Sequence, residues 1–178
     1  MSPRKLRVQQ AMLELKAKLE NPSAARSKLL QMGAKYVGRF HQTDTYINVP
    51  KGRLKLREVK DKTEAELIYY EREDIATPKR SSVSIVPIPQ PEVFKKILFQ
   101  MVEVRNTVRK VREIFMYEGV QIHLDDVSEL GYYVEFEQAT SEDEDQQKKD
   151  ILKLERIKEL LSIDPRNLEE LSYSDLIG

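Results

Sequence analysis

The sequence predicts an α+β protein in which about eight strands form one antiparallel sheet or barrel with helices outside it. Two observations carry this prediction. Segments of alternating apolar and polar residues, joined by short turn-forming stretches, recur up to about residue 140. Beyond that point the apolar residues recur at helical spacing. We therefore expect one domain over residues 1–178, with the sheet or barrel at about 11–140 and a helical appendage at about 141–178.

The first half of the chain alternates strands with two helices. Residues 11–19 predict a strand, and the next residues predict a helix capped by Asn21, begun by Pro22 and ended by Gly33. Residues 35–49 predict a broken pair of strands, followed by a turn at 50–52 and strands at 53–59, 65–72 and 80–86. The stretch "PQPEVFKKILFQM" predicts a second helix.

The second half contains the longest predicted strand and the appendage. A strand at 102–117 leads through a tight hairpin at Glu118–Gly119 into a strand at 120–126, and a last strand follows at 132–139. Ser141 and Glu144 predict a capping box for a helix that continues to about residue 162. The pair Asp164–Pro165 predicts the start of a second short helix.

Composition excludes several classes of protein and site. The chain has no Cys, which excludes disulfides and thiolate metal sites. Its 30 basic and 30 acidic residues balance, and the basic residues are interleaved with acids, so we expect no nucleic-acid partner. No long apolar run predicts a membrane span and the beginning of the chain lacks a signal-peptide core, so the default expectation is a cytoplasmic protein with no membrane partner.

Charged residues gather on one face of several predicted strands. These faces carry Glu14, Lys16 and Lys18; Arg53, Lys55 and Arg57; Tyr70 and Arg72; Lys110 and Arg112; His123 and Asp125; and Glu135 and Glu137. They are either the solvated outer faces of a half-exposed sheet or the lining of a closed barrel whose apolar outside is covered by helices. In a closed lumen the basic groups would need anions and the carboxylates would suit a divalent cation. That combination fits a triphosphate with Mg²⁺ or Mn²⁺.

Five stretches together resemble the CYTH family, the triphosphate tunnel metalloenzymes. They are "LELKAKL", "HQTDTYINVPKGRLKLRE", "AELIYYERED", "VRKVREIFMYEGVQIHLDDVSELGYYVEFE" and "SYSDLIG", and their order and spacing extend the resemblance from about Met12 to Leu176. The family includes class IV adenylate cyclases, thiamine triphosphatases and inorganic triphosphatases. The resemblance implies an eight-stranded antiparallel barrel that forms a tunnel for a triphosphate-containing small molecule.

The resemblance also implies roles for individual residues. The triphosphate would be bound by Lys16, Lys18, Lys55, Arg57, Lys110 and Arg112, with Arg72 as the substitute for a Lys that many relatives carry where this chain has Tyr70. The metal, Mg²⁺ or Mn²⁺, would be held by Glu14, Glu135 and Glu137, and Asp125 matches a further acidic position of the family motif. The catalytic set would be Glu14, Lys16 and Glu137.

Met12 is the main departure from the family pattern. It stands where the Glu-x-Glu-x-Lys signature has its first Glu, and methionine cannot bind a hard cation through oxygen. Three functions therefore stay open: a metal-dependent triphosphatase, an adenylate cyclase that forms cyclic AMP and pyrophosphate from ATP, and a triphosphate- or polyphosphate-binding module with little or no catalysis. Gln42 and Asp44 are expected to be structural, and His123 either contacts substrate or packs in the lining. Monomer and homodimer both remain possible.

Overall fold

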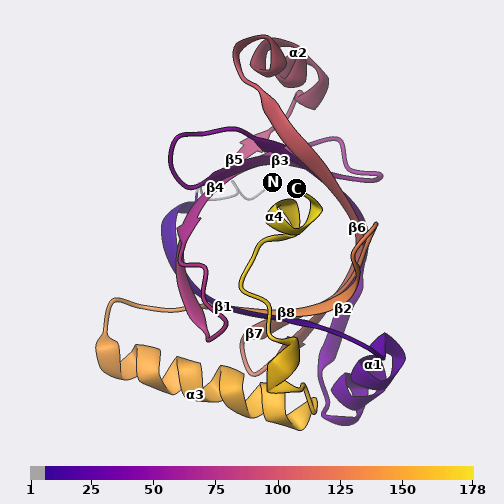
Figure 1. Ribbon diagram of the computed structural model, residues 1–178, viewed down its shortest axis with the longest axis vertical. Helices are drawn as coiled ribbons and strands as arrows, with labels where there is room; N and C mark the ends of the chain where they lie inside the picture. The colour runs from indigo at the N-terminus through magenta and orange to yellow at the C-terminus, as the bar shows by residue number, and fades with distance from the viewer. Residues whose placement is uncertain (1–6) are drawn as a thin grey trace.

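The barrel is closed and entirely antiparallel. The computed structural model describes residues 7–178, and in that part of the chain eight strands pair in the circular order β1-β5-β4-β3-β2-β6-β7-β8. Figure 1 looks down the barrel axis. The strands are β1 (Arg7–Lys18), β2 (Lys35–Ile47), β3 (Arg53–Val59), β4 (Ala65–Arg72), β5 (Lys79–Ile88), β6 (Val104–Tyr117), β7 (Val120–Val127) and β8 (Gly131–Ala139). The predicted fold class is confirmed.

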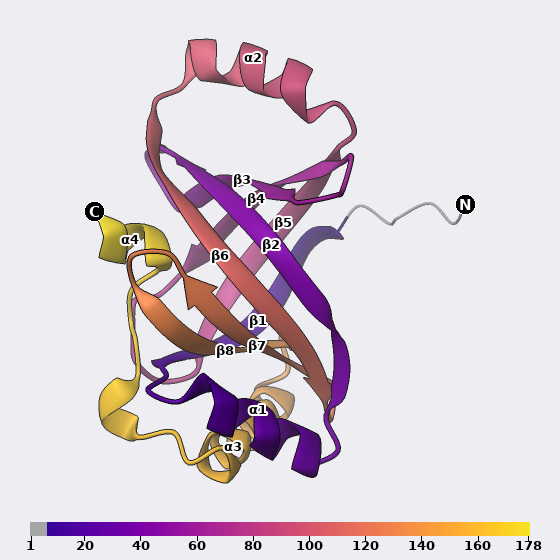
Figure 2. The same cartoon turned by 90° about the vertical axis from the view of Figure 1, so that its right-hand side faces the viewer.

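The helices lie outside the barrel wall or at its end. They are α1 (Pro22–Gln31), α2 (Pro91–Met101), α3 (Glu144–Leu160) and α4 (Tyr173–Ile177), with one 3₁₀ turn, η1 (Pro165–Asn167). Helices α1 and α3 lie on one side of the barrel and α2 on the opposite side (Figures 1 and 2). Helix α4 lies at one mouth of the barrel, and β1 begins toward the other (Figure 2). No helix in residues 7–178 is long and apolar enough to cross a membrane.

The main hydrophobic core lies between the outer face of the barrel and two helices. Leu13 and Leu15 of β1 pack in one buried cluster with Leu29 of α1 and with Leu154 and Ile157 of α3. Because successive side chains of a strand point to opposite faces, the residues between these leucines point into the lumen. The interpretation in which charged faces line a closed lumen, with apolar faces outside under helices, is therefore confirmed.

Three local predictions were wrong, the last of them in the segment after α3. Residues 35–47 form the single strand β2 because the 14-residue β6 pairs with them throughout; a register shift between Tyr36 and Gly38 accommodates the irregularity. Helix α3 is capped by Asp143, which accepts a hydrogen bond from the backbone N–H of Gln146. The Oγ of Ser141 accepts from the backbone N–H of Asp143 instead, so the predicted capping box does not form.

The chain after α3 returns to the barrel and reaches its mouth. The helix predicted at Asp164–Pro165 is only the 3₁₀ turn η1, after which Leu168 bridges to Ala17 of β1. Ser172 then forms a capping box that begins α4. Figure 1 shows the chain from η1 to α4 running over the opening of the barrel, with α4 in the upper part of the ring of strands. The C-terminal segment thus contributes to the lumen as well as to the outer surface.

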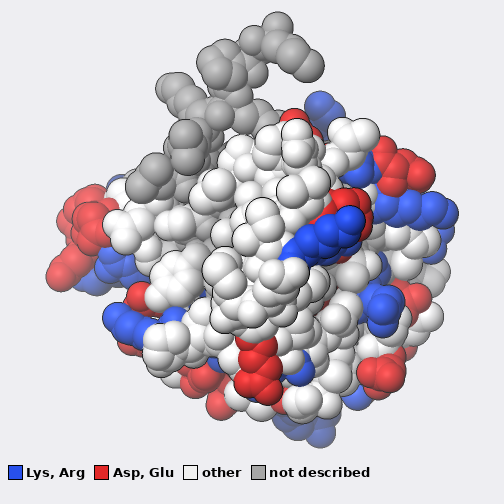
Figure 3. Space-filling model, turned by 90° about the horizontal axis from the view of Figure 1, so that it is seen from above, with Lys and Arg blue, Asp and Glu red and all other residues white. Residues whose placement is uncertain are grey.

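Helix α2 takes no part in the lumen. None of its residues is buried, and its apolar side chains Val93, Ile97 and Met101 are 52%, 56% and 71% exposed. Seen from the α2 side, uncharged residues occupy much of the middle of the surface, and charged side chains lie to the left, to the right and below (Figure 3). No residue of α2 is among those that line the barrel cavity.

Candidate active site in the barrel lumen

One cavity of about 230 Å³ occupies the lumen. Every strand of the barrel contributes to its lining, together with the C-terminal segment. The charged residues of the lining are Glu14, Lys16, Lys55, Arg57, Arg72, Lys110, Arg112, Glu135 and Glu137. Basic side chains outnumber acidic ones in this set, so the cavity as a whole suits an anion.

Asp44 holds three of the basic side chains together. Its carboxylate is fully buried on β2 and accepts two hydrogen bonds of 2.7 Å from Arg57. The ammonium groups of Lys110 and Lys55 lie 2.8 Å and 3.1 Å from the same carboxylate. Burial acts to raise the pKa of Asp44, but these cations hold it well below its usual range. One ionised carboxylate therefore offsets only part of the positive charge at this end of the cavity.

Arg112 is held in a second buried network. Its guanidinium donates to both oxygens of Asp125, at 2.7 Å and 2.6 Å, and to Glu135 at 2.9 Å. The hydroxyl of Tyr173 donates to Asp125 at 2.8 Å. Burial acts to raise the pKa of Glu135, while Arg112 holds it well below the usual range. Asp125 and Glu135 therefore fix the orientation of Arg112. Tyr173 of the C-terminal segment in turn holds Asp125.

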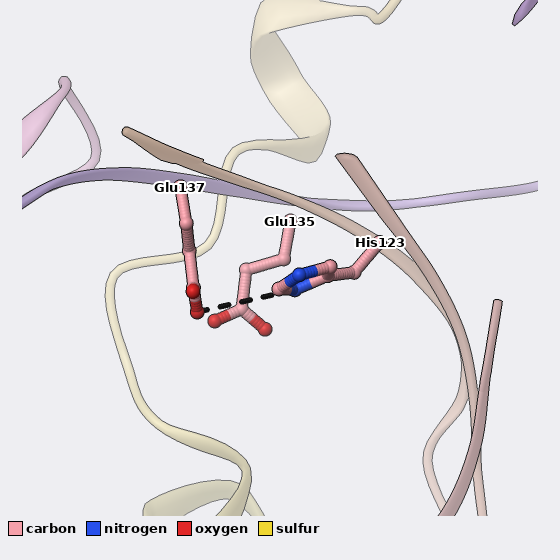
Figure 4. A group of neighbouring side chains, drawn as sticks. All are labelled: His123, Glu135 and Glu137. Atoms are coloured by element: carbon pink, nitrogen blue, oxygen red, sulfur yellow. Dashed lines mark ion pairs between the residues drawn. The ribbon is translucent and has the colours of Figure 1, made fainter. Parts of the chain in front are cut away.

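His123, Glu135 and Glu137 form a group that can hold a metal ion. One potential ligand atom from each lies within 4.8 Å of the other two. Figure 4 shows the side chains converging from β7 and β8, with Nδ1 of His123 3.9 Å from a carboxylate oxygen of Glu137. The registers explain this meeting, because His123 pairs with Glu135 across the strands and Glu137 lies two residues further along the same face.

The chemistry of this group fits a divalent cation. Burial and the nearby Arg112 lower the pKa of His123 to about 3, so the imidazole is neutral. Its Nε2 lies 3.1 Å from Oε1 of Gln121, an oxygen that can only accept, and this contact favours the tautomer with the proton on Nε2 and the lone pair on Nδ1. That Nδ1 is buried with no hydrogen-bond partner. Burial and the Glu135 and Glu14 carboxylates raise the pKa of Glu137 to about 7, a crowding that a cation would relieve.

Glu14 and Arg72 meet beside this group. Glu14 pairs in register with Glu137 of β8, accepts from Ser81 at 3.0 Å, and accepts from Nη1 of Arg72 at 3.3 Å. The other two guanidinium nitrogens of Arg72 are buried with no hydrogen-bond partner. A buried guanidinium with free donors is suited to an anionic oxygen.

Two buried lysines donate to backbone carbonyls of the C-terminal segment. Lys16 donates to the carbonyl of Leu171 at 2.7 Å and lies 4.3 Å from the ring centre of Tyr173. Lys79 of β5 donates to the carbonyl of Glu170 at 2.8 Å. Burial lowers the pKa of both lysines to about 8.

The structure brings most of the sequence-predicted residues into this one cavity, and three of them differ from the roles expected of them. Glu14 lines the cavity, but it is not part of the metal-competent group. Lys18 shares the strand face of Lys16 but is exposed at the end of β1 and is not among the lining residues. Asp125 is buried, but both its oxygens are engaged by Arg112, and it is not part of the metal-competent group. Sequence reasoning did not single out Asp44 as the anchor of three cations, nor His123 as a ligand, although alternation placed His123 on the same strand face as Asp125.

Comparisons with known proteins agree with this geometry. The sequence profile of the CYTH domain matches residues 10–170. A Methanocaldococcus jannaschii protein named "Putative adenylate cyclase MJ0240" is 27% identical over 175 residues, covering 93% of this chain and 98% of that protein. A solved structure from Pyrococcus horikoshii superposes with a TM-score of 0.81 at 22% identity, covering 94% of this chain and 99% of that one.

A more distant solved structure adds a described activity. It is a Hippeastrum protein with a TM-score of 0.67 at 15% identity, and 93% of each chain is covered. That protein is described as an adenylyl cyclase candidate with a dominant triphosphatase activity. At this identity the likeness to the present chain is one of fold.

Proposed function

Because this chain belongs to the CYTH family, we propose that it is a metal-dependent hydrolase of a triphosphate bound in the barrel lumen. The proposal rests mainly on one observation: basic side chains and a group that can hold a metal ion line the same cavity. Six basic side chains, Lys16, Lys55, Arg57, Arg72, Lys110 and Arg112, line the same space as the metal-competent group His123, Glu135 and Glu137. Phosphoryl transfer depends mainly on positioning and on neutralising phosphate charge, and this cavity supplies both.

The basic side chains would bind and align the phosphate chain. Arg57 and Arg112 are each fixed by bidentate contacts to a buried carboxylate, so they approach the phosphates already oriented. Arg72 would use Nε and Nη2, the two guanidinium nitrogens that make no hydrogen bond within the protein. Lys18 lies outside this set, because its side chain is exposed beyond the cavity.

The divalent metal would be held by His123, Glu135 and Glu137. When bound, it would neutralise charge on the phosphate oxygens. Both Mg²⁺ and Mn²⁺ accept carboxylate ligands, but an imidazole ligand favours Mn²⁺, because Mg²⁺ strongly prefers oxygen. Asp125 would act through Arg112, which it holds in place, rather than as a ligand.

Glu14 would assist the chemical step. It lies beside Glu137 in register and is oriented by Ser81 and Arg72. A water oxygen would form a bond to the terminal phosphorus while the bond from that phosphorus to the bridging oxygen breaks. The proton of the water would pass to Glu14, and the departing oxygen would keep the electron pair of the broken bond, stabilised by the basic side chains, Lys16 among them.

A direct assay tests the proposal. The purified protein is incubated with inorganic triphosphate, thiamine triphosphate or ATP, each with Mg²⁺ or Mn²⁺, and phosphate release is measured. Lys110→Met should lower kcat/KM by about tenfold or more, because it removes a buried cation from the site. Arg109→Met is the matched control, since the neighbouring Arg109 is exposed on the outer face of β6. Equal activity in the two variants, or no phosphate release from any substrate, would contradict the proposal.

The name of the Methanocaldococcus jannaschii relative supports a second candidate, adenylate cyclase. In that reaction the ribose 3′-oxygen of ATP would bond to the α-phosphorus and pyrophosphate would leave, within the same charged cavity. Cyclic AMP in the ATP incubation, without orthophosphate, would favour this function over hydrolysis. Tight triphosphate binding with neither product would indicate a binding module.

A further inference from the structure

Part of the cavity lining is apolar. Met12, Ile68, Val83 and Ile85, which we term the apolar wall, line the same space as the charged residues. They come from the adjacent strands β1, β5 and β4. We propose that the apolar wall binds a ring or hydrocarbon group attached to the triphosphate, so that the substrate is an organic triphosphate ester. This inference rests on the proposed triphosphate site and narrows its substrate class.

The strand registers make the apolar wall continuous. Ile85 of β5 lies directly opposite Ile68 of β4, and Val83 lies opposite Tyr70. Across the other edge of β5, Val83 pairs with Gln10 and Ser81 pairs with Met12, so Met12 and Val83 are diagonal neighbours. Cross-strand side chains on one face lie about 5 Å apart when directly opposite and about 7–8 Å apart on the diagonal. The apolar wall is therefore one surface.

The apolar wall directly adjoins the charged part of the cavity. Met12 precedes Glu14 by two residues on β1, and Ile68, Tyr70 and Arg72 follow one another on the inner face of β4. Residues two apart on a strand are separated by about 7 Å. A group esterified to a phosphate held by Arg72 would therefore meet the apolar wall without leaving the cavity.

Most of the apolar wall remains accessible in the lumen. Three of its four residues, Met12, Val83 and Ile85, are half-buried and line the cavity, and the fourth, Ile68, is buried. Apolar surface in contact with water is unfavourable, and an apolar group of a ligand would cover it. A bare triphosphate has no such group, so only an ester uses both parts of the lining.

The apolar wall gives Met12 a role in substrate binding. A Glu at this position, as in the family signature, would place a carboxylate at the edge of the apolar wall. Methionine instead extends the apolar surface onto β1 with a flexible side chain that adapts to different ring shapes. In the proposal, Met12 is a specificity-determining residue.

Calorimetric titrations in EDTA test the inference without catalysis. The probes are inorganic triphosphate, ATP and thiamine triphosphate. In the unmodified protein we expect at least one ester to bind about tenfold more tightly than inorganic triphosphate, with a more negative heat-capacity change on binding. This comparison requires no variant.

The variants Val83→Thr and Met12→Gln, single and combined, remove apolar character with little change in size. We expect the variants to lose the roughly tenfold tighter binding of the ester. Their affinity for inorganic triphosphate should stay within about twofold of that of the unmodified protein. Val86→Thr is the matched control, because Val86 lies on the outer face of β5 and is 42% exposed. Thermal melts confirm that each variant is folded.

Different outcomes would contradict the apolar-wall inference and the proposed function. If inorganic triphosphate binds as tightly as both esters, or if the variants weaken all three probes equally, the apolar-wall inference is overturned and the triphosphate site stands. If none of the three probes binds to the unmodified protein, the proposed function fails and the inference with it.

Discussion

Replacing Asp44 with Asn should destabilise the protein strongly. The substitution keeps the size of the side chain but leaves Arg57, Lys110 and Lys55 in the lumen without the buried carboxylate that holds them. Breaking a buried ion pair by removing one partner costs about 3–5 kcal/mol, because an uncompensated charge remains. At about 2–4 °C of Tm per kcal/mol for a chain of this size, the Tm should fall by about 6–20 °C.

Triphosphate should offset much of this loss, since it brings negative charge to the same three cations. Thermal melts followed by circular dichroism, with and without inorganic triphosphate, measure both the fall in Tm on substitution and the rise in Tm on ligand binding. A ligand at 100 times its Kd adds about 2.7 kcal/mol to the free energy of unfolding. The Tm of Asp44→Asn should rise more with triphosphate than that of the unmodified protein. Asp126→Asn, an exposed acid on β7, is the control. A Tm of Asp44→Asn within about 2 °C of the unmodified value would refute the reasoning.

Three further predictions address the metal group, the lysines and the C-terminal segment. His123→Asn should weaken Mn²⁺ binding by about tenfold or more, measured by the EPR signal of free Mn²⁺. The control His41→Asn, at an exposed position, should not weaken it. Equal Mn²⁺ affinities of the two variants would show that His123 is not a metal ligand. Because burial lowers the pKa of Lys110 to about 7, triphosphate binding above that pH should take up a proton and weaken as pH rises. Calorimetry in buffers of different ionisation enthalpy measures this uptake, and Lys110→Arg, which stays charged, should reduce it. Tyr173→Phe removes the hydroxyl that donates to Asp125 and should cost about 1–3 kcal/mol in urea unfolding, so an unchanged midpoint would count against that contact.

Much of the fold could be predicted because alternation is a local signal. Strands β3 and β4 agree with the predicted ranges to the residue, and the Glu118–Gly119 hairpin was also predicted. Both hairpin residues adopt positive φ, 49° and 79°, as this tight turn requires. The continuous strand β2 was missed because its irregularity at Gly38 is absorbed by pairing with β6, which no local pattern reveals.

The candidate site was predicted less completely than the fold. Alternation identified which residues share a face, but the distance from each residue to the cavity depends on strand stagger and on where the barrel ends. Lys18 therefore has the correct face and lies outside the cavity, while Asp44, expected to be structural, holds three lumen cations. His123 joins Glu135 only because β7 and β8 pair in one particular register.

The sequence by itself determined the strand faces, and with them the segregation of charge from apolar residues, because side-chain direction along a strand follows from backbone geometry alone. The family resemblance already implied that the sheet closes into a barrel. Only the tertiary structure decided that α4 lies at one mouth and that Lys16 and Lys79 donate to the returning C-terminal segment. These contacts join residues far apart in the chain. Their energies arise from burial and charge compensation in the closed lumen, which exists only once all the strands have paired.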